Sequence, residues 1–173
     1  MRKIRYSVAM SLDGYIAGPN GEADWIVADP EFDFAGLWAQ FDTLLMGRRT
    51  YEAAVARFGG KARFQGMKTF VASRTLRQAD NPDMTILSDL TRDWIQQLRS
   101  QPGKDIWLMG GGELFRLLLE MQEVDTVEVS IVPVLLGSGV ALLPSPAPQT
   151  KLKVASHKAY PSGFVSLVYE VHR

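Results

Sequence analysis

Three short stretches of the sequence place glycine, hydroxyl or guanidinium groups directly after an apolar run. They are residues 47–50 (GRRT), 73–75 (SRT) and 110–112 (GGG). Glycine lets a phosphate approach the backbone closely, and a helix that follows directs its free N–H groups at the same place. Arginine together with serine and threonine hydroxyls suits a phosphate monoester. The chemistry that these stretches predict is the binding of a phosphorylated ligand.

The triple glycine lies within DIWLMGGGELFRLLLE, residues 105–120. Residues 106–109 are apolar and predict a buried strand, and Glu113 opens a helix that is apolar on nearly every side. Taken alone, this junction has two interpretations: an anion site, or a tight turn that needs small residues for packing. Neither GxGxxG nor GxxxxGK(S/T) is present to decide between them. The other two stretches favour the anion site.

The apolar runs before these stretches predict strands that alternate with helices. We expect strands at residues 4–12, 43–46, 69–72, 84–87, 106–109 and 127–131. Helices are expected to begin near Pro30, after Gly47, after Asp89 or Thr91, and at Glu113. The first carries apolar residues as far as Phe41, and the second has Phe58 on its inner face. Residues 15–17 are expected in a loop, and residues 137–139 in a turn or a lid. Such alternation indicates an α/β protein with a largely parallel sheet.

The end of the sequence predicts a different pairing. Apolar residues alternate from Leu152 to Val154 and again from Val165 to Val171, with a turn at residues 161–163 (PSG) between them. This pattern is typical of a hairpin that adds antiparallel strands at one edge of the sheet.

In an open parallel sheet, ligands bind beyond the carboxyl ends of the strands, which is where all three stretches fall. Arg48, Arg49 and Arg74 are more cations than a pyrophosphate needs. They favour the additional 2′-phosphate of NADP over NAD, whose ribose calls for an acidic residue instead. The alternative, a solvated charged face, is less favoured because three such clusters follow three strands.

The chain has the length and composition of one domain, residues 1–173. It contains no cysteine, which fits a reducing compartment, so we expect a cytoplasmic protein. Its 19 basic and 19 acidic residues cancel, which argues against nucleic acid or a membrane surface as the partner. His157 and His172 alone cannot make a metal site, so no metal is expected.

Several motifs resemble a known superfamily. MGRRTYE (46–52), KTFVASRT (68–75) and LMGGGELF (108–115) resemble the cofactor-binding segments of the dihydrofolate reductase superfamily. SLDGYIAGPNGE (11–22) and PVLLGSGVALLP (133–144) are more similar to its other branch, the reductase domain of riboflavin biosynthesis, which is the C-terminal half of a bifunctional deaminase-reductase. The resemblance implies a three-layer dihydrofolate reductase-like fold with helices on both faces of the sheet.

The resemblance also implies NADPH as cofactor. The cofactor-binding residues that it implies are Ala9, Ile16, Gly47, Arg48, Arg49, Thr50, Ser73, Arg74, Gly110, Gly111, Gly112, Glu113 and Leu114. The arginines and Ser73 correspond to the side of the 2′-phosphate, the glycines with Thr50 and Leu114 to the pyrophosphate, and Ala9 and Ile16 to the nicotinamide. Hydride transfer needs no protein nucleophile, because the cofactor carries the chemistry and the protein orients the reactants.

Dihydrofolate reductases place a carboxylate on the first helix that supports protonation of the substrate. By resemblance the candidates here are Glu31 and Asp33, with Asp29 nearby, and the spacing back from Gly47 favours Glu31. The alternative for each is an exposed acid that the helix dipole favours at an N-terminus. Ser130 stands where that family often has a threonine that supports the carboxylate. Asp13, beside Gly14, is interpreted as a turn residue.

The sequence therefore predicts an NADPH-dependent oxidoreductase. By resemblance it transfers a hydride to a small heterocycle or a ribosylamino-pyrimidine phosphate, as 5-amino-6-(5-phosphoribosylamino)uracil reductase does. The alternatives are dihydrofolate reductase activity and a non-catalytic NADP-binding regulatory module. The zinc deaminase half of the bifunctional enzymes has no counterpart in this sequence. The expected partners are a small-molecule substrate and a second copy of the chain in a homodimer, as in the riboflavin reductases.

Overall fold

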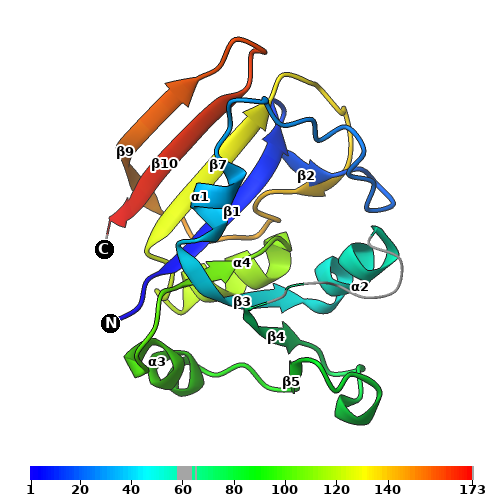
Figure 1. Cartoon of the computed structure of the whole chain (residues 1–173), viewed down its shortest axis with the longest axis vertical. Helices are drawn as coiled ribbons and strands as arrows, with labels where there is room; N and C mark the ends of the chain where they lie inside the picture. The colour runs from blue at the N-terminus through cyan, green and yellow to red at the C-terminus, as the bar shows by residue number, and fades with distance from the viewer. Residues whose placement is uncertain (58–63, 65, 173) are drawn as a thin grey trace.

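A sheet of eight strands forms the centre of the computed structural model, which describes residues 1–57, 64 and 66–172 (Figure 1). Its strands are β1 (Ile4–Ser11), β3 (Phe41–Gly47), β4 (Lys68–Ala72), β5 (Thr85–Leu87), β6 (Asp105–Leu108), β7 (Thr126–Val132), β9 (Lys151–Ala159) and β10 (Val165–His172). Their order across the sheet is β5-β4-β3-β6-β1-β7-β10-β9. The strands from β5 to β7 are parallel, and β10 is antiparallel to both β7 and β9. The largely parallel sheet with an antiparallel hairpin at its edge is confirmed.

One face of the sheet packs against α3 (Arg92–Ser100) and α4 (Gly112–Glu120). On β1, every second side chain points to this core, including Ile4 and Tyr6, which are fully buried. From α4, Phe115 stacks on Tyr6 and Leu118 is fully buried. The helix that follows the triple glycine is thus fixed by burial of its apolar side chains.

The opposite face carries a second core with α1 (Phe34–Trp38) and α2 (Arg48–Arg57). Leu44 and Met46 of β3 and Trp107 of β6 are buried there. Trp38 of α1 packs edge-on against Trp107, with ring centroids 5.4 Å apart. With helices on both faces, the three-layer arrangement is confirmed.

The first helix is shorter than the sequence indicated. It starts at Phe34 because the Asp33 side chain accepts the N–H of Gly36 and caps it, so Pro30 lies before the helix. Phe41, expected on the helix, instead begins β3 and is buried in the core. Phe58, expected on the inner face of the second helix, lies outside the described residues.

A small second sheet was not evident in the sequence. β2 (Tyr15–Ala17) pairs antiparallel with β8 (Val140–Ala141), where the sequence indicated only a loop and a turn. Gly139 has φ +156°, and a Cβ there would overlap the Ala17 carbonyl oxygen, so glycine is needed for the pairing. The sheet joins the segment after β1 to the segment after β7.

Candidate cofactor site

The three glycine, hydroxyl and guanidinium stretches follow three strands that are neighbours in the sheet. β3 pairs with β4 on one side, with Gly47 opposite Ala72, and with β6 on the other, with Leu45 opposite Leu108. The backbone N–H of Met109 donates to the Leu45 carbonyl oxygen at 3.0 Å, which extends this pairing to the edge of the triple glycine. The predicted convergence at one edge of the sheet is therefore present.

Thr50 brings two of the stretches into contact. It lies in the first turn of α2, and a Cβ atom on Gly111 would be 3.2 Å from its Oγ1 atom. Gly110 and Gly111 have φ of +62° and +84°, a region that residues with a Cβ enter only at a cost. The first two glycines thus permit a sharp turn that passes close to Thr50.

The N-terminus of α4 has no side-chain cap. Gly111 is its N-cap residue and offers no side-chain oxygen, so the first amide N–H groups of the helix are available to an anion. Leu114 is 7% exposed and buried in the core, and so reaches a ligand only through its backbone. The exposed Glu113 carboxylate forms an ion pair with Arg116 at 2.8 Å, which reduces its repulsion of a phosphate.

Close packing requires glycine at position 112. A Cβ there would lie 2.6 Å from the Ala141 carbonyl oxygen and 2.8 Å from Cδ of Pro144. The interpretation of the triple glycine as a packing turn is therefore correct for Gly112. Because the contact is with β8, the segment after β7 lies directly against the start of α4.

Gly47 differs from the other glycines at this edge. A Cβ added to it would meet no atom of the described residues within 4 Å, and its φ does not lie in the left-handed region. Neither backbone conformation nor packing within the described residues requires glycine here. The space beside Gly47 is open to a ligand.

The three arginines are not equivalent. Arg48 forms an ion pair with Glu52 at 3.0 Å along α2. Arg49 and Arg74 are exposed, and neither makes an ion pair within the described part of the chain. Since Gly47 lies opposite Ala72, these two arginines follow adjacent strand ends. Of the three arginines in these stretches, Arg49 and Arg74 are therefore the ones that a phosphate group can recruit.

Ser73 is partly committed to the loop. Its hydroxyl oxygen accepts the N–H groups of Thr75 at 3.2 Å and Leu76 at 3.0 Å, which shapes the turn after β4. Ser73 is buried, at 9% exposed, and its hydroxyl also lies 3.4 Å from the Thr75 hydroxyl, where either group can be the donor. Its side chain is therefore used mainly to shape this turn.

Ala9 and Ile16 lie on the part of the molecule next to the triple glycine. β1, which carries Ala9, is the neighbour of β6, and Ala9 is half-buried opposite Ser130 of β7. Ile16 is buried, at 9% exposed, in the strand that pairs with β8. Their expected contact with a nicotinamide stays a prediction.

The three candidate acids differ in their exposure to solvent. Glu31 is exposed, and Asp33 is exposed and caps α1 through the N–H of Gly36 at 2.7 Å. Asp29 is buried and accepts the backbone N–H groups of Glu31 at 2.8 Å and Ser162 at 3.2 Å. Hydrogen bonds from Ser162 and Glu31 hold the pKa of Asp29 below its ordinary value. The catalytic role expected for Glu31 and Asp33 stays a prediction.

Asp13 does more than form a turn. Its carboxylate accepts the Ser11 hydroxyl at 2.6 Å and the backbone N–H groups of Leu136 at 3.1 Å and Gly137 at 2.7 Å. The Ser11 hydrogen bond, with those from the two amides, holds the pKa of Asp13 below its usual range. Asp13 thereby ties the end of β1 to the turn after β7. Asp-Gly in the sequence signalled the turn but not this distant partner.

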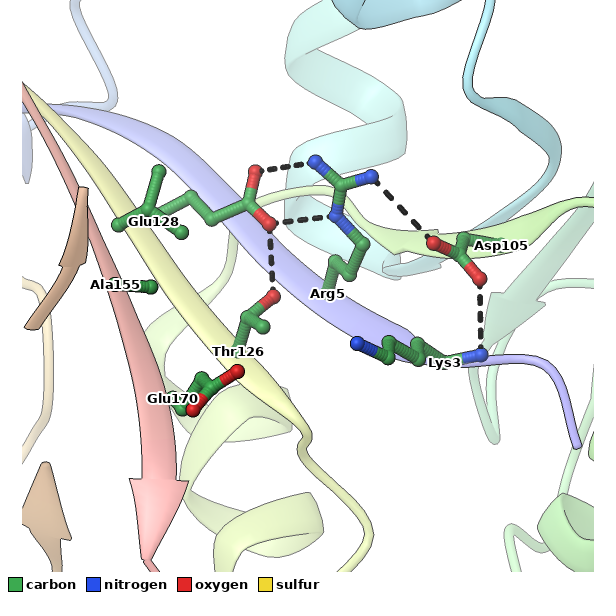
Figure 2. Close-up of a pocket in the computed structure, with 8 residues that line it drawn as sticks. Lys3, Arg5, Asp105, Thr126, Glu128, Ala155 and Glu170 are labelled. Carbon is green, nitrogen blue, oxygen red and sulfur yellow. Dashed lines mark hydrogen bonds and ion pairs between the residues drawn. The ribbon is translucent and has the colours of Figure 1, made fainter. Parts of the chain in front are cut away.

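A shallow pocket of about 220 Å³ lies at the opposite end of β1 from Ala9 and contains a charge cluster that the sequence did not suggest (Figure 2). Arg5 donates to both carboxylate oxygens of Glu128, at 2.6 and 2.9 Å, and lies 3.5 Å from Asp105. Glu128 also accepts the Thr126 hydroxyl at 2.8 Å. Arg5 is thus held by carboxylates from two neighbouring strands, and these contacts tie β1 to β6 and β7.

The described residues contain no group of three or more histidine, cysteine, aspartate or glutamate side chains placed to hold a metal ion. No helix in the part of the chain that the structure describes is long and apolar enough to cross a membrane.

The sheet order and the glycine junctions at the carboxyl ends of neighbouring strands define an α/β protein of the dihydrofolate reductase-like fold. Within that class the chain belongs to the RibD C-terminal domain family, whose model matches residues 2–166.

Relatives extend over almost the whole chain. YyaP of Bacillus subtilis (strain 168) is 33% identical over 97% of this chain and 94% of its own length. A crystal structure from Shewanella sp. PV-4 assigned to riboflavin biosynthesis covers 100% of both chains at 26% identity, with a TM-score of 0.82. The diaminohydroxyphosphoribosylaminopyrimidine deaminase/5-amino-6-(5-phosphoribosylamino)uracil reductase of Thermotoga maritima has a TM-score of 0.73 at 16% identity, and the match covers 99% of this chain and 57% of that one. At that identity the likeness concerns the fold.

Proposed function

We propose that this protein is an NADPH-dependent reductase that transfers a hydride to a small heterocycle or a ribosylamino-pyrimidine phosphate. Membership of the RibD C-terminal domain family supports an oxidoreductase role. The reductase named for the Thermotoga maritima protein supplies the example of 5-amino-6-(5-phosphoribosylamino)uracil as a substrate.

One observation carries the cofactor assignment. Two exposed arginines, Arg49 and Arg74, follow adjacent strand ends beside open space at Gly47, and the uncapped N-terminus of α4 lies one strand further along. A phosphate monoester at one end and a pyrophosphate at the other match this distribution of donors. NADPH carries both groups, whereas NADH lacks the monoester.

In this proposal the chain binds and orients, and the bound NADPH supplies the hydride. Arg49 and Arg74 hold the 2′-phosphate, and the amides at the start of α4 hold the pyrophosphate. Thr50 fixes the turn of the triple glycine so that these amides point to the ligand. Asp13 and the β2–β8 sheet hold the segments beside Ala9 together, which keeps water from the reacting atoms.

Thermal unfolding with NADPH, with NADH and without ligand tests the cofactor assignment. At a concentration of 100 times its dissociation constant, NADPH is expected to stabilise the fold by about 2.7 kcal/mol, or about 5 to 10 °C. Arg49→Ala and Arg74→Ala should each weaken NADPH binding by about ten- to a hundredfold, the cost of a lost charged hydrogen bond, and leave NADH binding unchanged. Lys151→Ala, on the exposed strand β9, is the matched control.

The outcomes separate the alternatives. Equal increases in melting temperature with NADPH and NADH would show that Arg49 and Arg74 do not recognise the 2′-phosphate. No increase with either nucleotide would contradict the cofactor assignment. NADPH binding without oxidation on any heterocyclic substrate would favour a non-catalytic regulatory module. Turnover of dihydrofolate that persists in Glu31→Gln and Asp33→Asn would show that neither acid supports protonation.

We also propose that the chain forms a homodimer through β9. All nine residues of this edge strand are exposed, and its apolar side chains Leu152 and Val154 are 44% and 53% exposed. An exposed edge strand of this length is a ready pairing surface. Light scattering should give twice the mass of the chain. Val154→Glu should lower the measured mass, whereas Val27→Glu, at an exposed position outside β9, should not. A monomeric mass for the unaltered protein would contradict the proposal.

A further inference from the structure

Tyr51 and Asn81 form a hydrogen bond between the two segments that carry Arg49 and Arg74. The Tyr51 hydroxyl donates to Oδ1 of Asn81 at 3.1 Å. Tyr51 lies near the start of α2, shortly after Arg49, and Asn81 lies in the loop between β4 and β5, which also carries Arg74. Within the described residues no other hydrogen bond or ion pair joins α2 to this loop. The contact is therefore the polar link between the segments of the two arginines.

The side chain of Asn81 is held in one orientation. Its Nδ2 atom donates to the Arg77 carbonyl oxygen at 2.9 Å, so the Oδ1 atom is the one that faces Tyr51. An amide oxygen is an acceptor only, and the Tyr51 hydroxyl must therefore be the donor. The backbone of Asn81 is also held, because its carbonyl oxygen accepts the side-chain amide of Gln78 at 3.0 Å. The loop thus presents a fixed acceptor to α2.

The same loop is tied to β5 near both of its ends. The N–H of Ser73 donates to the Leu87 carbonyl oxygen at 2.9 Å. Further along the loop, the side-chain oxygen of Gln78 accepts the N–H of Ile86 at 2.9 Å. Because the loop is braced in this way, a restraint on one part of it also limits where Arg74 can lie.

The ring of Tyr51 is held by packing. Tyr51 is half-buried, and it packs with Leu76 of the loop against the core on the α2 face of the sheet. The hydroxyl at the end of the ring is therefore directed by the core. Phenylalanine at this position would keep the ring and its apolar contacts and would lose only the hydrogen bond to Asn81.

This hydrogen bond acts against an electrostatic repulsion. Arg49 and Arg74 are exposed and carry like charges on neighbouring segments, so without an anion they favour separation of α2 from the loop. A phosphate monoester that accepts hydrogen bonds from both guanidinium groups reverses this preference. Ordering the two segments during binding costs free energy, and a contact that holds them beforehand lowers that cost. The hydrogen bond between Tyr51 and Asn81 is such a contact.

We propose, on the basis of the cofactor assignment above, that Tyr51 and Asn81 are positioning residues for NADPH. Their hydrogen bond holds α2 and the loop after β4 at the separation at which Arg49 and Arg74 both reach one phosphate monoester. NADH has no monoester, so its binding does not use this arrangement. The pair therefore contributes to the preference for NADPH over NADH, and it acts through the arginines.

Tyr51→Phe tests the positioning role. The dissociation constants of NADPH and NADH are measured by calorimetry for this variant and for the unaltered protein. NADPH binding should weaken by about three- to tenfold, the range of one net hydrogen bond, and NADH binding should not change. Tyr169→Phe is the matched control, because it removes a hydroxyl from a half-buried tyrosine of β10, and it should leave both constants unchanged. Equal weakening of both nucleotides in Tyr51→Phe, or no weakening, overturns the proposal.

A second variant shows whether the two residues act through one bond. Asn81→Ala removes the acceptor and should lower the preference for NADPH by at least as much as Tyr51→Phe, because it also releases the Arg77 carbonyl oxygen. The double variant should lose no more than Asn81→Ala alone, since the hydrogen bond is already absent. Additive losses would mean that the residues act independently and would overturn the proposal. Thermal unfolding without nucleotide verifies that each variant is folded.

Failure of the positioning role and failure of the cofactor assignment give different results. An unaltered protein that binds neither nucleotide, or binds both equally, contradicts the cofactor assignment and the positioning role with it. An unaltered protein that prefers NADPH, with the full preference kept in Tyr51→Phe, contradicts the positioning role alone.

Discussion

Thr50 Oγ1 lies 3.2 Å from the position that a Cβ atom of Gly111 would occupy. This contact joins the start of α2 to the turn that precedes α4, and therefore links two strand ends that are far apart in the sequence. The shape of the candidate anion site depends on it.

Gly111→Ala should damage both stability and cofactor binding. With φ at +84°, an alanine costs about 1–2 kcal/mol of unfolding free energy, and its Cβ also displaces Thr50. Chemical denaturation and NADPH titration measure the two effects. Gly21→Ala is the matched control, since Gly21 has φ +87° with open space around it. It should lose similar stability but bind NADPH normally; weakened binding in both variants would indicate a general effect of stability.

Gly47→Ala should weaken NADPH binding without lowering the stability of the fold. A Cβ there meets nothing within 4 Å and φ is not left-handed, so the protein without ligand should be unchanged or more stable by up to about 1 kcal/mol. If the open space beside Gly47 receives the cofactor, the added methyl group should weaken NADPH binding by about tenfold, or about 1.4 kcal/mol. Unchanged affinity would place the cofactor elsewhere.

Leu118→Ala tests the packing that holds α4 on the sheet. Leu118 is fully buried, and removing its side chain leaves a cavity that should cost about 2–5 kcal/mol of unfolding free energy. Leu12→Ala, at a position that is 63% exposed, should change the unfolding free energy by less than about 0.5 kcal/mol. Urea denaturation of both variants makes the comparison. A small loss in Leu118→Ala would mean that α4 is anchored by other contacts.

Asp13 should make stability depend on pH in the acidic range. The Ser11 hydroxyl and two amides lower its pKa in the folded state below the ordinary 3.8, so its ionised form is favoured by folding. This contribution is fully present above about pH 5 and is lost as the pH falls through the folded pKa. Asp13→Asn should therefore melt at a lower temperature than the unaltered protein at pH 7. The two melting temperatures should converge towards pH 3. A difference in melting temperature that does not change with pH would show that protonation of Asp13 does not affect stability.

Much of the sheet and the location of the candidate site followed from the sequence. The runs before Gly47, Ser73 and Gly110 are short, apolar and followed by polar or flexible residues, and such runs form buried parallel strands. Because parallel strands share one carboxyl edge, the polar stretches after them had to converge there. Local pattern was sufficient because each strand and its following junction are contiguous in the chain.

Details that depend on distant partners did not follow from the sequence. The helix α1 begins at Phe34, later than expected, because Asp33 caps it. Phe41 belongs to β3, where its ring stacks on that of Trp107. Asp13 and Asp29 gained backbone partners 124 and 133 residues away, at Gly137 and Ser162. No periodicity or motif records contacts at such separations.

The sequence by itself determined the succession along the chain of the eight strands of the main sheet and the four α-helices, the positions of the glycine junctions and the arginines near them, since these are properties of contiguous residues. Only the tertiary structure decided which arginines stay free: Arg48 pairs with Glu52, whereas Arg49 and Arg74 do not pair within the described residues. It also brought the Asp29 carboxylate to the backbone N–H of Ser162, in the turn between β9 and β10. Those relationships arise from packing between elements, where burial and charge are shared by residues that the chain itself keeps apart.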